Sequence, residues 1–234
     1  MKKILFSLVA LVASMSMNAQ IVKIMKGGDV VASYTAEQAD SVVFEEAPAS
    51  TTGTAKATIG GNEVDVNWVQ LWENGPKFAE YNVGVTDGKA ESYGGYYAWG
   101  GNLNKGGGYN SGTDVLTGDA DTATKLWGSN WRMPTKAELD ALLANCDVVW
   151  TTVNGVNGKK FTGKGDYSSN SVFLPAAGNC VGGNVSGQGN GGYYYSSTPY
   201  GSTYAYYLYI LSGSSQYVRN TNRFYDYSVR AVLK

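Results

Sequence analysis

The chain has 234 residues, which is enough for one good-sized domain and a small appendage. Its 31 glycines and 18 tyrosines, set against only 16% charged residues, favour many turns and short strands over long helices. The 18 basic residues are outnumbered by 19 acidic ones, which argues against a nucleic-acid partner, and the absence of histidine excludes Ser-His and Cys-His catalysis.

The first 19 residues have the pattern of a secretory signal peptide. They combine a basic start at Lys2 and Lys3, an apolar stretch over 4–12 and a small-residue cleavage site that ends at Ala19. We therefore expect an exported protein, either extracellular or at the cell surface. The apolar stretch is too short to span a membrane and no second one follows it, so no transmembrane segment is expected.

Three strand-like runs follow the signal, over 21–26, 30–34 and 41–44. The next stretch is rich in Ala, Thr, Ser, Gly and Pro and has little to bury, which predicts a linker. The expected organisation is a signal peptide over 1–19, a short β leader over 20–44, a linker over 45–58 and a main domain over 59–234.

The clearest helix of the main domain is predicted to begin after Thr135. Thr135 and Glu138 form a capping box, in which each side chain accepts a hydrogen bond from the other residue's backbone amide. Leucines at 139, 142 and 143 give one apolar face, and the pattern ends near Asn145. A second, weaker helix is predicted over 119–126.

Strands and turns make up nearly all the rest. The run 148–153 leads into Asn154-Gly155, and Asn157-Gly158 follows; both pairs are tight-turn signals. A short apolar strand is predicted over 171–175, with Pro175 closing it or placing it at a sheet edge. Four further strands are then predicted over 193–198, 204–211, 216–219 and 227–233.

Alternation within 204–211 assigns its side chains to two faces. The row with Leu208 and Ile210 is the expected core face, so Tyr207 and Tyr209 should point toward solvent or a ligand. A sheet covered on both faces would instead bury these two tyrosines as well.

Several motifs follow one another in a fixed order through the main domain. They are WVQLW at 68–72, GGYYAWG at 94–100, WGSNWRMPT at 127–135, FLPAAG at 173–178, YSST at 195–198 and SVRAV at 228–232. In this order they resemble the Fibrobacter succinogenes major paralogous domain family, although Tyr195 stands where that family more often has Trp and Asp226 where it often has Gly.

The resemblance implies an α+β fold like that of C-type lectins and of formylglycine-generating sulfatase-modifying enzymes, with few helices and many short antiparallel strands. Similar domains are common in exported and surface proteins of gut Bacteroidetes, mostly with no assigned activity. The segment 21–44 also looks like a short β module that precedes various domains in that group.

The sequence offers little for catalysis or for metal binding. The sulfatase-modifying enzymes need a matched pair of copper-binding cysteines, and Cys146 and Cys180 do not match those positions. A disulfide between them and two inert thiols both remain open. The run 119–121 has two of the oxygen ligands that begin a calcium loop but lacks its Gly and closing Glu. We therefore expect no enzyme, no metal and no cofactor.

Eleven of the 18 tyrosines lie between Tyr193 and Tyr227. Tyrosine offers a rigid ring with a polar tip, and the interleaved Ser, Gly and Asn supply adaptable hydrogen-bonding groups, which is the composition of binding loops. The alternative is that these rings pack a β-rich core. The candidate ligand-binding residues are Tyr200, Tyr204, Tyr207, Tyr209, Tyr217, Arg219, Asn220 and Asn222.

Together these features predict an exported, non-enzymatic binding module for a glycan or protein ligand. One alternative is a structural subunit of a surface assembly, whose leader strands add to a neighbour's sheet edge. Others are an enzyme that uses a carboxylate or a cysteine, and a receptor whose C-terminal strands are diversified by a retroelement that mutates adenines.

Overall fold

A computed structural model describes residues 21–26, 29–35, 50–101, 108–213 and 215–234. The chain divides into two compact units, Met1–Ala49 and Ser50–Lys234. Within the described residues no helix is both long and apolar enough to cross a membrane. The expected signal peptide, 1–19, lies outside the described residues.

The first unit contains a two-stranded antiparallel sheet. Strand β1 (Ile21–Lys26) pairs with β2 (Asp29–Thr35), and the register shifts between Ile24 and Met25. The first two expected strand-like runs are therefore strands. The third, 41–44, lies outside the described residues.

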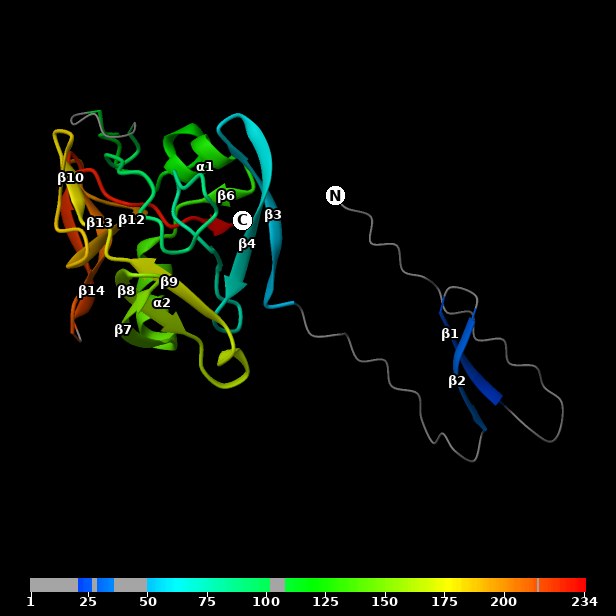
Figure 1. The fold of residues 1–234 in the computed structure, drawn as a ribbon. Helices are drawn as coiled ribbons and strands as arrows, with labels where there is room; N and C mark the ends of the chain where they lie inside the picture. Colours follow the sequence, from blue (N-terminus) through cyan, green and yellow to red (C-terminus); the bar gives the residue numbers. More distant parts are fainter. Residues whose placement is uncertain (1–20, 27–28, 36–49, 102–107, 214) are drawn as a thin grey trace. The chain divides into compact units, whose positions relative to one another are not determined.

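The second unit opens with the long hairpin of β3 (Thr52–Ile59) and β4 (Asn62–Gln70), drawn in cyan in Figure 1. Gly60 and Gly61 form its turn with φ of 59° and 82°, in the left-handed region that favours glycine. Strands β5 (Lys77–Ala79), β15 (Val232–Leu233) and β6 (Trp131–Arg132) complete a five-stranded sheet in the order β3-β4-β5-β15-β6.

The structure corrects the expected linker over 45–58. Residues 52–58 belong to β3, which pairs with β4 over its whole length. Alternate side chains of β3 turn inward, and Ala57 is 2% exposed in the core. The small side chains of this segment do not by themselves indicate a strand. Pairing with β4 stabilises it, rather than large apolar side chains of its own.

The other strands form two three-stranded sheets and a short hairpin. They are β7 (Asp147–Val153), β8 (Val156–Thr162) and β9 (Ser171–Pro175); β10 (Asn179–Val181) with β11 (Asn184–Ser186); and β12 (Gly191–Tyr200), β13 (Tyr204–Leu211) and β14 (Gln216–Asn222). The described chain is thus mostly antiparallel strand with few helices, which is consistent with the expected α+β class and equally with a mainly β class.

Of the two expected Asn-Gly turns, one is confirmed. Asn154 and Gly155 join β7 to β8 with φ of 47° and 84°. Asn157-Gly158 was expected to be a turn as well, but both residues lie inside β8. Glycine is needed at 158 for another reason, since a Cβ there would lie 2.3 Å from the carbonyl oxygen of Leu174 on β9.

Both expected helices are present. Helix α2 (Lys136–Asn145) has the predicted capping box, with the amides of Thr135 and Glu138 each donating to the other residue's side chain. The weaker helix is split into a 3₁₀ turn, η1 (Gly118–Ala120), and α1 (Thr122–Trp127). A second 3₁₀ turn, η2 (Gly165–Tyr167), precedes β9.

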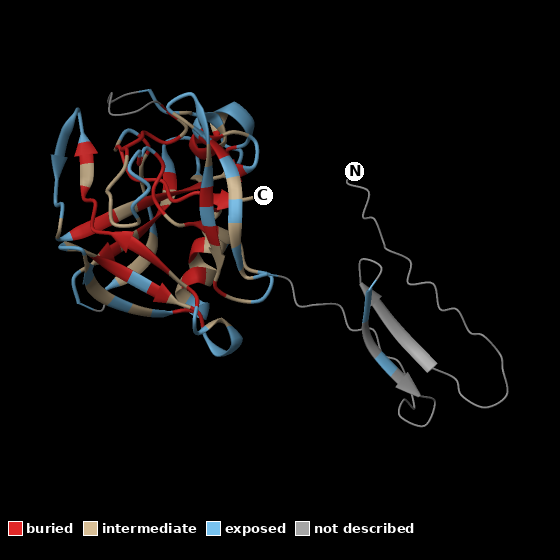
Figure 2. Cartoon of the chain, turned by 45° about the vertical axis from the view of Figure 1, so that its right-hand side comes forward, coloured by how far each residue is buried: buried red, intermediate tan, exposed pale blue. Residues whose placement is uncertain are grey.

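Figure 2 shows that the second unit has a buried interior, and most residues of the motifs that carry the family resemblance are buried or half-buried. Arg230 is 2% exposed and donates to the side chain of Asn82 and to the carbonyls of Ala79 and Phe173, at 2.9 to 3.0 Å. Burial lowers the pKa of Arg230 to about 10. Trp99 likewise donates from its indole to the carbonyl of Ser196. These motif residues tie distant segments together.

Candidate binding surface

The sheet β12-β13-β14 divides the predicted ligand-binding residues between its two faces. Cross-strand partners lie on the same face of an antiparallel sheet. The register pairs Tyr207 with Arg219 and Tyr209 with Tyr217 on one face. On the other face it pairs Tyr204 with Asn222 and Tyr200, and Tyr206 with Asn220. The eight residues therefore do not form one site.

Closely packed tyrosine rings fill the first face. The ring centroid of Tyr193 lies 4.6 Å from that of Tyr209 and 4.9 Å from that of Tyr227. Tyr207 packs against Tyr227 at 5.1 Å and is only 8% exposed. The prediction that Tyr207 faces solvent or a ligand is therefore wrong; the sheet is covered on both faces, because Tyr227 and its neighbours pack over this one.

The outer end of this stack reaches solvent. Tyr209 is half-buried and lies 5.2 Å from Tyr217, and the exposed guanidinium of Arg219 lies 4.3 Å from the Tyr217 ring. Burial raises the pKa of Tyr209 to about 12, so its phenol is neutral at physiological pH. This end has the chemistry of a recognition surface but presents little free ring area.

The second face is buried at Leu208 and Ile210, but its end near the β12–β13 turn leaves tyrosines exposed. Tyr200 and Tyr204 are 51% and 41% exposed at the turn between β12 and β13. The Tyr200 ring meets Tyr204 at 6.5 Å and Tyr206 at 5.5 Å, both edge to face. The ammonium of Lys136, on α2, lies 5.2 Å from the Tyr206 ring. Tyr206 and Lys136 were not among the residues predicted from sequence.

Arg223 joins several backbone segments at this end of the sheet by hydrogen bonds. It is fully buried and donates to the carbonyls of Tyr204 (2.9 Å), Asn110 (2.7 Å), Gly112 (2.7 Å) and Gly201 (2.5 Å). Its guanidinium also lies 4.0 Å from the ring of Trp99. Burial lowers the pKa of Arg223, and the carbonyl dipoles compensate for the lost hydration. Nothing in the local sequence distinguished Arg223 from a surface charge.

Four exposed aromatic residues lie on or next to the segments that this arginine contacts. Among the residues whose side chains the structure describes, the exposed aromatic ones are Tyr109, Tyr200, Tyr204 and Phe224. The carbonyl of Tyr204 accepts a hydrogen bond from Arg223. Tyr109 and Tyr200 directly precede Asn110 and Gly201, whose carbonyls also accept from Arg223. Phe224 directly follows Arg223 in the sequence. We call these four residues the aromatic surface.

Both cysteines are free thiols, so the alternative of a disulfide is not the arrangement found. They lie in different parts of the core, Cys146 beside Leu142 and Cys180 beside Tyr96 and Ala177. Burial raises the pKa of Cys146 to about 12; burial and then the Asp226 carboxylate raise that of Cys180. A protonated, buried thiol is a poor nucleophile, which agrees with the alternative of inert thiols.

Asp121, the second carboxylate of the Asp-Ala-Asp run at 119–121, has a structural role. Asp121 is 1% exposed and accepts from the amide of Thr124, capping α1, and from the amide of Met133 at 2.8 Å. Burial raises the pKa of Asp121, and these amides counteract the effect. In the described part of the chain no three His, Cys, Asp or Glu side chains are placed to hold a metal ion.

In a comparison with known families, residues 146–232 match a family described as Domain of unknown function (DUF8237). Over this stretch, which contains Arg223 and the whole of β12, β13 and β14, the chain is similar to that family. No curated protein and no solved structure matches the chain.

Proposed function

We propose that this chain is an exported, non-enzymatic binding module with the C-type lectin-like fold of the major paralogous domain family. The preponderance of antiparallel strands over helices supports that fold. The buried, hydrogen-bonded positions of Arg230 and Trp99, both within the family's motifs, support it further. The proposal rests on these features together.

The aromatic surface is the proposed contact site. The observation that carries this assignment is that all four of its rings come from segments that one buried arginine holds together. An aromatic ring left in water does not gain the stabilisation that burial would give, which is roughly 25 cal/mol for each Å² of apolar surface. The Tyr200 and Tyr204 rings are in contact, and an exposed apolar patch is characteristic of interaction sites. The Arg223 contacts also order the backbone before binding, which lowers the entropic cost of association.

A glycan is the ligand that we favour. The apolar faces of sugar rings pack against aromatic rings, while sugar hydroxyls need donors and acceptors at the edge. Tyr200 and Tyr204 supply rings with polar tips, and Asn220 and Asn222 supply amides on the same face of the sheet. A protein ligand would use similar chemistry, so the experiment must separate the two.

The test is a glycan array probed with the chain from Gln20 to Lys234, with and without calcium. The double variant Tyr200→Ala/Tyr204→Ala removes exposed rings and should keep the fold. We expect it to lose the binding that the wild type shows. The matched control, Tyr217→Ala/Arg219→Ala, lies on the opposite face of the same sheet and should bind as the wild type does.

Three results would count against the proposal. Equal loss in both double variants would indicate a general disturbance of the sheet. A folded wild type that binds no glycan would move the assignment to a protein ligand. Self-association of the wild type without any ligand would favour the structural subunit of a surface assembly.

A further inference from the structure

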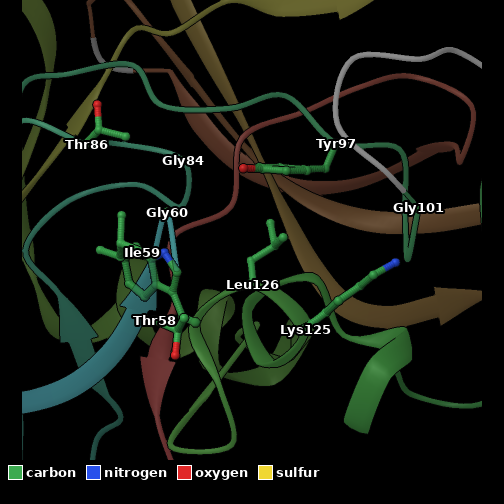
Figure 3. Close-up of a pocket in the computed structure, with 10 residues that line it drawn as sticks. Thr58, Ile59, Gly60, Gly84, Thr86, Tyr97, Gly101, Lys125 and Leu126 are labelled. Carbon is green, nitrogen blue, oxygen red and sulfur yellow. The ribbon is translucent and has the colours of Figure 1, made fainter. Parts of the chain in front are cut away.

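A cavity of about 200 Å³ lies beside α1 in the second unit (Figure 3). It is bounded by the end of β3, the loop that follows Val83, the segment after Tyr96 and the last turn of α1. The residues that matter for its chemistry are Ile59, Gly84, Thr86, Tyr97, Leu126 and Trp127. None of them belongs to the aromatic surface.

Tyr97 places a hydroxyl in this cavity. The residue is 2% exposed, and its backbone is fixed by two hydrogen bonds to Tyr227, both 2.9 Å long. Its ring extends over Leu126 with the hydroxyl directed toward Gly84 (Figure 3). Within the described part of the chain this hydroxyl makes no hydrogen bond, unlike the buried hydroxyls of Tyr96 and Tyr194. The hydroxyl oxygen is not closed off from solvent, so a ligand that enters the cavity can reach it.

Gly84 keeps the space in front of that hydroxyl open. A Cβ at position 84 would lie 2.6 Å from the Tyr97 hydroxyl oxygen and 2.6 Å from the amide nitrogen of Gly95. Gly84 has a φ of 88°, in the left-handed region. Any larger residue would therefore close the cavity at the place where a partner for Tyr97 must sit.

The walls opposite the hydroxyl are largely apolar. Ile59, Leu126 and Trp127 supply hydrocarbon surface, and Leu126 is 40% exposed at the edge of the cavity. Thr58, Thr86 and Lys125 supply polar groups elsewhere in the lining. A ligand with an apolar body would cover Leu126 and accept a hydrogen bond from the hydroxyl in place of solvent.

We propose that this cavity binds a small molecule made of one apolar ring and a carbonyl oxygen that accepts a hydrogen bond from Tyr97. An engineered cavity of about 150 Å³ holds benzene, so the volume here admits one six-membered ring with a short substituent. The site is independent of the proposed glycan surface, and either can fail without the other.

The test compares two probes of the same shape. Acetophenone has the ring and the carbonyl, whereas ethylbenzene has the ring alone. Titrations followed by two-dimensional amide NMR should show acetophenone binding about tenfold more tightly, the effect of one hydrogen bond. The largest signal changes should fall on Gly84, Thr86 and Leu126.

Two conservative variants assign the effect to the hydroxyl. Tyr97→Phe keeps the ring, so acetophenone should weaken to the affinity of ethylbenzene while ethylbenzene is unchanged. Tyr204→Phe removes an exposed hydroxyl elsewhere and should change neither affinity. The proposal is overturned if neither probe binds up to its solubility, if the signal changes fall outside the cavity, or if Tyr97→Phe leaves the preference for acetophenone intact.

Discussion

Backbone carbonyls, rather than carboxylates, hold the two fully buried arginines of the described chain. Arg223 uses four carbonyls, and Arg230 uses carbonyls together with the side chain of Asn82. Arginine keeps its charge even when burial lowers its pKa, and its planar fork reaches several acceptors at fixed angles. Each arginine therefore fixes the relative positions of segments that are far apart in the sequence.

Replacing Arg223 by lysine should destabilise the second unit. The variant Arg223→Lys keeps a buried charge but cannot reach the four carbonyls, which leaves several acceptors unpaired. We expect the free energy of unfolding to fall by about 3 kcal/mol, measured by chemical denaturation. Arg219→Lys is the matched control at an exposed position and should change it by less than about 0.5 kcal/mol. Equal effects would contradict the role given to Arg223.

Removing the hydroxyl of Tyr194 and that of Tyr97 should change the free energy of unfolding differently. Tyr194 is 1% exposed and donates to the carbonyl of Pro175 at 2.5 Å. Tyr194→Phe therefore leaves that buried carbonyl without this hydrogen bond. The expected loss in unfolding free energy is about 1 to 2 kcal/mol. Tyr97→Phe removes a hydroxyl with no partner in the described chain and should leave ligand-free stability unchanged or slightly higher. Thermal denaturation of both variants checks this, and a larger loss at Tyr97 would contradict the cavity geometry.

At the scale of elements, the N-terminus of α2 depends on its cap. Thr135→Ala removes the acceptor of the Glu138 amide and should lower the free energy of unfolding by about 1 kcal/mol. In the described chain Thr117 stands at the same position before η1 but makes no capping bond through its side chain, so Thr117→Ala is the matched control. Chemical denaturation should show little change for Thr117→Ala. Equal losses in the two variants would argue against the capping box.

Glu138 should make stability depend on pH. Burial alone would raise its pKa, but hydrogen bonds from Arg132 and the Thr135 amide outweigh burial and lower it. A lowered folded-state pKa adds stability above the unfolded value, about 4.3, and that stability is lost as pH falls through the folded value. The advantage of wild type over Glu138→Gln should therefore shrink on acidification below about pH 4.3. Denaturation at a series of pH values measures it, with exposed Glu63→Gln as control.

The local signals predicted the elements that depend on local chemistry. The capping box at Thr135 and the Asn154-Gly155 turn need only neighbouring residues, and both were found where the sequence placed them. Strand β3 and the glycine at 158 depend on a partner strand, which no short window contains. The burial of Tyr207 has the same cause, because Tyr227 covers it from a distant segment.

At the scale of the whole molecule, the aromatic surface could be predicted only in part. Tyr200 and Tyr204 stood out because rings beside a glycine turn carry a local signal. Tyr109 did not, since it lies more than a hundred residues from Arg223 in the sequence, and only the folded chain brings its neighbour Asn110 to that arginine. A site organised by such long-range contacts has no motif of its own.

We propose that the aromatic surface, rather than the opposite face of the sheet, binds the ligand. Isothermal titration of the strongest array glycan into wild type, Tyr200→Ala/Tyr204→Ala and Tyr217→Ala/Arg219→Ala compares the two faces. We expect Kd to rise at least about tenfold in the first variant, because two aromatic contacts are lost, and to stay unchanged in the second. The reverse pattern would place the ligand on the packed tyrosines of the opposite face and would contradict this assignment.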